Sequence, residues 1–105
     1  MATVGIALVS VSNVAEAGLN SVQPVPDSST AYSESKTSSA SSQQSSTVVP
    51  QRGGLLWEIV PSGGAVWVTF GPNPVASAGV TFQVPDGAVR HFKANAGDKA
   101  AIIDG

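Results

Sequence analysis

The sequence predicts an all-β protein, a small antiparallel β-barrel or sandwich of about five or six short strands preceded by a long extended N-terminal arm. Two observations support this fold class. Apolar runs in residues 53–105 are separated by Gly- and Pro-rich turn signals at short intervals, which is typical of a sandwich or a small barrel. A Ser-rich tract precedes these runs, and its composition does not favour a core of its own.

Residues 1–22 begin with a predicted strand over Thr3–Val11, in which Val4, Ile6 and Leu8 alternate with smaller residues. Residues 13–22 then indicate a turn or one helical turn. The strand has no partner close by in the sequence. We therefore expect it to act as an anchor that pairs with a distant segment or with another chain.

Residues 23–52 form the predicted arm. Ten of the nineteen residues from Ser28 to Ser46 are serine, and prolines lie on both sides of the tract. The few apolar side chains cannot offset the entropy lost on ordering such a segment. We expect a flexible arm, spanning at most ~80 Å over residues 27–50 at roughly 3.3 Å per residue, that becomes ordered across neighbouring subunits.

Residues 53–105 form the predicted β-domain, which holds five of the six aromatic residues. Gly63 and Gly64 lie in a predicted hairpin turn and are expected to supply positive φ angles. Asp86 and Asp98 lie in Pro-Asp-Gly and Gly-Asp-Lys, which are typical turn sequences. The predicted strands are Leu55–Val60, Ala65–Phe70, Val80–Val84, Ala88–Ala94 and Lys99–Asp104.

Two of these strands have apolar residues on both faces. In Leu55–Val60 only Glu58 is polar, and in Ala65–Phe70 the face opposite the valines carries Trp67. A domain of about 53 residues without disulfides or a metal is marginally stable alone, and oligomerisation is a common remedy. We therefore expect Trp57 or Trp67 to face a neighbouring subunit, with the alternative that both tryptophans fill one core.

Composition excludes several classes of partner. Five Lys and Arg against seven Asp and Glu give a net charge of −2, which argues against nucleic acid or an anionic membrane as the partner. The chain has no cysteine, so we expect a reducing compartment or stabilisation by assembly. No Lys or Arg precedes Lys36, which does not favour a signal peptide, and the N-terminal apolar run is shorter than the ~20 residues of a membrane span.

Residue types for catalysis are sparse. The single histidine, His91, is flanked by Arg90 and Phe92 and has no nucleophile placed beside it by the sequence. We expect Arg90 and His91 to lie on the surface or at an interface. The sequence therefore predicts no enzyme, no cofactor and no metal site.

Three stretches show a distinctive succession of strand and turn sequences. They are Ala65–Pro74 (AVWVTFGPNP), Val84–Gly87 (VPDG) and Gly97–Ile103 (GDKAAII). They resemble small virion proteins of tailed bacteriophages, in which a short β-barrel domain follows a Ser/Thr/Ala-rich segment. The resemblance covers about half of the chain. It implies a capsid decoration (cement) protein, assembled in the host cytoplasm and located in the virion. It also implies a homotrimer or higher symmetric oligomer that binds the major capsid protein or other virion proteins.

Two sets of alternatives stay open. The chain could be a head–tail connector, neck, tail or fibre-attachment protein. More remotely, it could be a secreted β-domain, or a module that binds carbohydrate on the host surface through exposed tryptophans that stack on sugars. For the virion role, the candidate subunit-interface residues are Val4, Ile6, Leu8, Tyr32, Trp57, Trp67, Arg90 and His91.

Overall fold

The computed structural model describes the backbone of residues 1–15, 22–51 and 54–105, and the side chains of residues 1–10, 32–51 and 54–105. Within these residues the chain forms eight strands and no helix, so the predicted all-β class is confirmed with more strands than the five or six expected. The strands are β1 (Thr3–Ala15), β2 (Val22–Thr37), β3 (Gln43–Gln44), β4 (Leu55–Ser62), β5 (Val66–Gly71), β6 (Phe82–Val84), β7 (Arg90–Lys93) and β8 (Lys99–Asp104).

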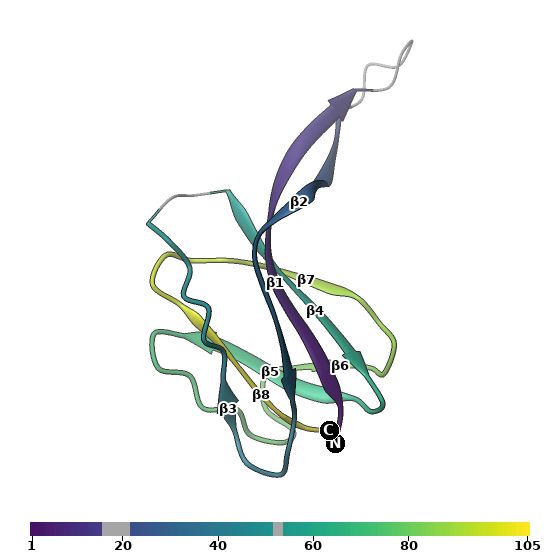
Figure 1. Ribbon diagram of the computed structural model, residues 1–105, viewed down its shortest axis with the longest axis vertical. Helices are drawn as coiled ribbons and strands as arrows, with labels where there is room; N and C mark the ends of the chain where they lie inside the picture. Colours follow the sequence, from purple (N-terminus) through teal and green to yellow (C-terminus); the bar gives the residue numbers. More distant parts are fainter. Residues whose placement is uncertain (16–21, 52–53) are drawn as a thin grey trace.

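The strands form a sandwich of two four-stranded antiparallel sheets (Figure 1). Sheet A has the order β2-β1-β4-β7, and sheet B has the order β3-β8-β5-β6. The edge strands are therefore β2 and β7 in sheet A, and β3 and β6 in sheet B. The inner faces of both sheets supply the buried apolar cluster.

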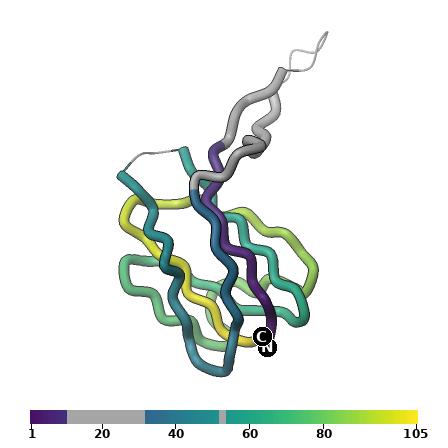
Figure 2. The backbone as a smooth tube through the Cα atoms, in the orientation of Figure 1, coloured from purple at the N-terminus to yellow at the C-terminus, as the bar shows by residue number. Residues whose placement is uncertain are grey.

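The pairing follows that of a jelly roll. β2 pairs with β1, β3 with β8, β4 with β7, and β5 with β6. If the count starts at β2 and β1 is placed last, the first strand pairs with the eighth, the second with the seventh, and so on inward, as in an eight-stranded jelly roll. The amine of Met1 lies 3.4 Å from Oδ1 of Asp104, so the two ends of the chain meet where a jelly roll passes from one sheet to the other (Figure 2).

The five strands predicted in residues 53–105 are all present as β4 to β8. β8 has the predicted bounds, and β7 is the most shortened, because it covers only Arg90–Lys93 of the predicted Ala88–Ala94. Of the two glycines in the predicted hairpin turn, Gly63 has a φ of 95°, whereas Gly64 is not among the glycines with positive φ. Local alternation and turn residues were therefore sufficient to locate these strands.

The N-terminal strand is confirmed. The expectation that it has no partner close by in the sequence is wrong, because it pairs with β2, the next strand along the chain, as well as with the distant strand β4. β1 lies between β2 and β4, with Ile6 opposite Ile59 and Leu8 opposite Trp57. The turn predicted over residues 13–22 falls largely on residues 16–21, which lie outside the described residues. β1 continues as far as Ala15 and β2 begins at Val22.

Described residues of all three predicted segments lie in one sandwich. The backbone at 32–37, within the predicted arm, is edge strand of sheet A beside β1. The chain then crosses to sheet B, where β3 pairs with β8 and the Val49 N–H donates to the Asp98 carbonyl at 2.9 Å. Composition predicted an arm separate from the domain, because a Ser-rich segment has little apolar surface. In the structure, backbone pairing with other strands of the sandwich holds this Ser-rich segment in place.

The core is centred on Trp57, which is 0% exposed. Along β4 the odd-numbered residues point inward and the even-numbered residues outward, as a half-buried strand requires. The Trp57 ring stacks on Phe70 of the opposite sheet with a centroid separation of 5.7 Å. The other fully buried large apolar residues of this core are Val4, Ile6, Leu8, Ile59, Val66, Val68, Val84 and Ile102.

One part of sheet A extends beyond the sandwich. β1 pairs with β4 only as far as Ser10, opposite Leu55, but it pairs with β2 as far as Ala15, opposite Val22. Residues 11–15 and 22–26 thus form a two-stranded hairpin ribbon that projects from the body (Figure 1). The radius of gyration of 14.5 Å exceeds the roughly 13 Å expected for a compact chain of this length, in accord with this projection.

Candidate interaction surface

Four of the predicted interface residues lie inside the chain. Val4, Ile6, Leu8 and Trp57 are at most 1% exposed and belong to the core. The expectation that they contact another subunit is corrected for this reason. The strand that carries the first three is covered by sheet B of its own chain, and Trp57 faces the same interior.

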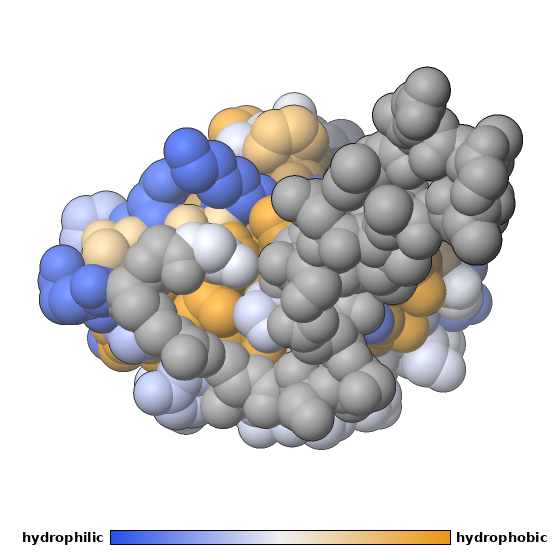
Figure 3. Space-filling view, turned by 90° about the horizontal axis from the view of Figure 1, so that it is seen from above, coloured by the Kyte–Doolittle hydropathy of each residue, from blue (hydrophilic) through white to orange (hydrophobic). Residues whose placement is uncertain are grey.

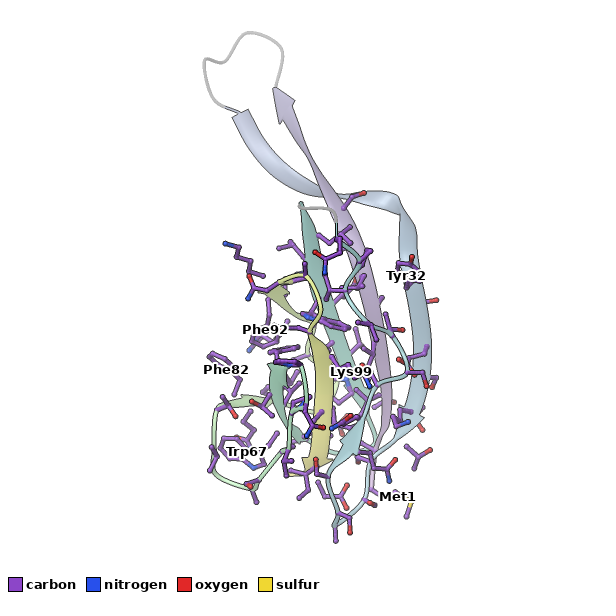
Figure 4. The ribbon with its side chains drawn as sticks, turned by 90° about the vertical axis from the view of Figure 1, so that its left-hand side faces the viewer. Met1, Tyr32, Trp67, Phe82, Phe92 and Lys99 are labelled. Atoms are coloured by element: carbon purple, nitrogen blue, oxygen red, sulfur yellow. The ribbon has the colours of Figure 1, made fainter. Side chains whose placement is uncertain are left out.

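Trp67 lies on the outer face of sheet B and is partly exposed. On this face Trp67 is in register with Ile103 of β8 and Gln83 of β6. The loop that follows β5 is tied to the β3 region, because Gln44 Nε2 donates to Asn73 Oδ1 at 2.8 Å and to the Pro74 carbonyl at 3.0 Å. Figure 4 shows Trp67 on the side of the molecule away from Tyr32.

Tyr32 is the predicted interface residue on the β2 edge of sheet A. It lies on β2, opposite Leu8, and its side chain is 48% exposed. Tyr32 and the remaining predicted residues on β7 therefore lie on opposite edges of sheet A. The structure does not bring the predicted interface residues together into one surface.

Arg90 and His91 lie on β7, the outer strand of sheet A, and both are exposed. The Ala94 N–H donates to the Leu55 carbonyl at 3.1 Å. Residues that exchange hydrogen bonds alternate along an antiparallel pair, so Phe92 directs its backbone groups towards β4. The backbone N–H and C=O groups of His91 and Lys93 consequently point to the open edge.

An aromatic row closes the sandwich beside this edge. The ring centroids of Phe70 and Phe92 are 5.1 Å apart, and those of Phe92 and Phe82 are 5.0 Å apart. Phe82 is 51% exposed although its strand partner Val68 is buried. Figure 4 shows Phe82 and Phe92 side by side, from the edge strands of the two sheets.

Backbone strain occurs next to Phe82. Thr81 has a φ of 73°, in the left-handed region, and its hydroxyl donates to the Val80 carbonyl at 2.6 Å. A β-branched residue in this region is unusual, and such strain costs on the order of 1–3 kcal/mol. The strained residue directly precedes β6 and its exposed phenylalanine.

Apolar and basic side chains share this region. We define the β6–β7 edge surface as Val80, Phe82, Val89, Arg90, His91 and Lys93, all of which are exposed. The strands β6 and β7 contain no acidic residue. Oε2 of Glu58 on the neighbouring strand β4 lies 3.9 Å from Nε2 of His91, and the turn residue Asp86 accepts a hydrogen bond from the Gly63 N–H at 3.0 Å.

Sequence reasoning selected two of these six residues, Arg90 and His91. It placed Val80 and Phe82 on the buried face of a half-buried strand. The face predicted for Phe82 agrees with the pairing of Phe82 to Val68. The exposure of Phe82 arises because β6 is an edge strand. No local pattern specifies which strand lies at an edge, so this signal was not available from the sequence.

Two polar clusters join segments of the fold. Ser38 Oγ donates to Asp104 Oδ1 at 2.5 Å and accepts from the Ala2 N–H at 2.8 Å. The hydrogen bond from Ser38 holds the pKa of Asp104 below its ordinary value. The second cluster consists of the Glu34 carboxylate and the backbone N–H groups of Thr47 and Ser46. Partial burial raises the pKa of Glu34, but the hydrogen bonds from these N–H groups lower it by more, so the pKa lies below its ordinary value.

No group of three or more His, Cys, Asp or Glu residues that could hold a metal ion occurs among the residues whose placement is described. The described residues also include no helix long and apolar enough to cross a membrane. In a view along the long axis, apolar surface shows between hydrophilic side chains (Figure 3).

Comparison with protein-family models, curated proteins and solved structures finds no match for this chain.

Proposed function

We propose that this chain is a structural protein of a tailed-bacteriophage virion, a capsid decoration (cement) protein that binds a shell of repeated subunits. The observation that carries this proposal is the hairpin ribbon, which extends beyond the last pairing of β1 with β4. A compact sandwich with a projecting pair of strands can rest on one subunit and reach another. The location in the virion and the major capsid protein as partner are parts of the same proposal.

The fold supports the proposal without deciding it. Jelly rolls occur in viral capsid proteins, and they also occur in lectins and cupins. Function is therefore argued from the ribbon and the surface rather than from the fold. A homotrimer or larger ring would present several ribbons at once, and simultaneous binding would multiply a modest contact by avidity.

Particle binding tests the proposal. The variant replaces residues 12–25 with Asn-Gly, a two-residue hairpin turn that keeps the strand pairing of the sandwich. We expect the variant to fold and to sediment with phage particles at least about tenfold more weakly than the full chain. Equal binding by the two proteins would contradict the role of the ribbon, and no binding by the full chain would contradict the function.

Copy number separates a decoration protein from a neck or tail protein. A decoration protein is present in proportion to the capsid subunits, whereas a neck or tail ring contains about six to twelve copies. Densitometry of purified virions distinguishes these outcomes directly.

A second candidate function rests on Trp67, which is partly exposed and flanked by Gln83 on the outer face of sheet B. An aromatic ring beside a hydrogen-bonding amide is suited to stacking on a sugar. Binding to a glycan array that is lost in Trp67→Ala and retained in Tyr32→Ala would support a carbohydrate-binding module. A signal for neither protein would leave the decoration role as the supported function.

A further inference from the structure

Strand β2 forms a long outer edge of sheet A. It is the first strand in the order β2-β1-β4-β7, and Tyr32 marks this edge in Figure 4. The other edge strands β3, β6 and β7 are two, three and four residues long, whereas β2 has sixteen residues. An edge strand presents N–H and C=O groups with which another chain can pair. Among the described edges, β2 is therefore the longest template for a further strand.

The hydrogen bonds to β1 show which residues of β2 face the open edge. The Ser38 N–H, directly after β2, donates to the Ala2 carbonyl at 2.8 Å. Residues that exchange hydrogen bonds alternate along an antiparallel pair, so the even-numbered residues at this end of β2 direct their backbone groups to β1. The residues that direct theirs to the open edge are Ser33, Ser35 and Thr37, all of which are exposed.

The open edge is regular over residues 33–37. The pairing of β1 with β2 shifts in register between Leu8 and Val9, which ends the regular ladder beside Tyr32. No proline occurs in residues 33–37, so every outward-facing residue supplies an N–H. At about 3.4 Å per residue the segment spans roughly 17 Å, the length of an ordinary strand.

The charges on this segment are complementary to those of a second copy of itself. Glu34 and Lys36 are two residues apart on one face of the sheet, with Ser35 between them. If two β2 strands pair antiparallel about a two-fold axis at Ser35, Glu34 of each copy lies opposite Lys36 of the other. An axis one residue away would place two Glu34 or two Lys36 side chains opposite each other, and like charges in that position are destabilising. Charge therefore selects the register centred on Ser35.

The hydrogen-bonding positions agree with this register. Ser35 lies opposite Ser35 of the second copy, and Ser33 lies opposite Thr37, so residues with outward N–H and C=O groups meet each other. Glu34 and Lys36 then take the non-hydrogen-bonded positions, where opposing side chains are closest. Backbone pairing and charge thus specify the same alignment of the two strands.

The Glu34 carboxylate is already held in place at this edge. The Ser46 and Thr47 N–H groups donate to its Oε2 and Oε1 at 3.2 and 2.9 Å. A carboxylate has about four acceptor sites, so it can also accept the Lys36 ammonium of a second copy. Because one partner of the ion pair is ordered beforehand, less conformational entropy is lost when the pair forms.

The opposite edge of sheet A lacks this complementarity. β7 carries Arg90, His91 and Lys93 and no acidic residue. Pairing of two β7 edges would bring cations together, and basic side chains on an edge strand oppose such association. The charges therefore favour self-pairing at β2 over self-pairing at β7.

We propose that two copies of the chain associate through β2, which pairs antiparallel with β2 of the second copy about a two-fold axis at Ser35. The two four-stranded A sheets then form one continuous sheet. The same surface is used on both copies, so this contact alone gives a dimer. The homotrimer expected for a decoration protein would need a different contact, and the inference therefore goes beyond the proposed function.

Proline at position 35 tests the backbone pairing. Sedimentation equilibrium of the purified full-length chain should show a monomer–dimer equilibrium. Ser35→Pro removes an N–H that points away from β1, a position at which edge strands tolerate proline. The monomer should keep its fold, and the dimer, which loses this hydrogen bond twice, should associate at least about tenfold more weakly. Ser35→Ala keeps the N–H and is the matched control, which should associate like the wild-type chain.

Charge reversal tests the register. Lys36→Glu places two carboxylates opposite each other at both symmetry-related positions, so the association constant should fall at least about tenfold. Lys93→Glu makes the same change in net charge on the other edge of sheet A. This control should associate like the wild-type chain, and circular dichroism should show the same β spectrum for all variants.

Amide hydrogen exchange provides a test on the wild-type chain alone. Exchange at Ser33, Ser35 and Thr37 should slow as the protein concentration rises, because these amides enter the new ladder. Four results would overturn the proposal: a wild-type chain that stays monomeric at all concentrations, undiminished association of Ser35→Pro, association of Lys36→Glu as strong as that of Lys93→Glu, or exchange at the three amides that does not depend on concentration.

The outcome is separable from that of the particle experiment. A monomeric chain that binds particles would contradict the β2 contact and leave the decoration role standing. A dimer that binds no particle would support the β2 contact and contradict the decoration role.

Discussion

Ser38 and Asp104 are joined by a 2.5 Å hydrogen bond between residues 66 positions apart. Ser38 follows β2 of sheet A, and Asp104 ends β8 of sheet B, so the bond links the two sheets. The same hydroxyl accepts the Ala2 N–H, and the Ser38 side chain is buried. A serine of a low-complexity tract thus has a specific structural role at the junction of three segments.

Ser38→Ala tests this role. The substitution leaves the buried Ala2 N–H without its acceptor, and an unsatisfied buried group costs roughly 1–3 kcal/mol. Urea unfolding of the variant should show a free energy of unfolding lower by that amount. Ser35→Ala, at an exposed position of β2, is the matched control and should change stability by less than about 0.5 kcal/mol. Equal stability of the two variants would contradict the linking role.

Acidification should destabilise the fold through Glu34 and Asp104. Both carboxyl groups have a pKa below the ordinary values of 4.5 and 3.8, because each accepts hydrogen bonds in its ionised form. A group whose folded-state pKa lies below its unfolded-state pKa stabilises the fold above the unfolded-state value, and this contribution disappears as the pH falls through the folded-state value. The free energy of unfolding should therefore stay level from pH 7 to about pH 5 and decrease below it.

Glu34→Gln separates the two groups. The amide cannot ionise, so the variant should lose less stability than the wild-type chain between about pH 5 and pH 3. Parallel curves for the two proteins would show that the contact of Glu34 with the Ser46 and Thr47 backbone does not contribute to the pH dependence.

The two tryptophans should differ in fluorescence. Trp57 is fully buried, and its indole Nε1 has no hydrogen-bond partner within the described part of the chain, whereas Trp67 is partly exposed. Trp67→Phe, which retains Trp57, should emit at shorter wavelength and resist acrylamide quenching. Trp57→Phe should show the reverse. Similar quenching of both variants would place Trp57 at a surface, as the sequence-based interpretation allowed.

Thr81 provides a test of backbone strain. Its φ of 73° is accessible to glycine without a steric cost, and relief of the strain outweighs the greater flexibility of glycine in the unfolded chain. Thr81→Gly should therefore raise the free energy of unfolding by up to about 1 kcal/mol. Thr69→Gly, within β5, is the contrasting change and should lower it by a similar amount, since glycine weakens a strand interior. Destabilisation by Thr81→Gly would contradict the strain.

Prediction from sequence succeeded where a local pattern determines the structure. The apolar run Leu55–Val60 and the following Gly63 turn indicated β4 directly. It failed to identify β2 as a strand at Ser33 and Ser35, because these residues are held by pairing with β1, a contact that composition does not report. It left Trp57 and Trp67 equivalent, because both strands are apolar on two faces and only the packing of one sheet on the other selects the inner face.

Circular permutation tests the jelly-roll pairing. Met1 and Asp104 are in contact, and β1 and β8 lie in different sheets, so a short Gly/Ser linker from residue 105 to residue 1 completes the eight-strand path that begins at β2. The chain is opened within residues 16–21, leaving β1 and β2 paired as strands with separate ends. Because every strand pair is retained, the permutant should fold with a free energy of unfolding within about 2 kcal/mol of the original chain. A chain opened within β8, between Ala101 and Ile102, is the control and should not fold, because both of these residues are fully buried in sheet B. An unfolded permutant would show that the β1–β2 connection, rather than the order of strand pairing, holds sheet A together.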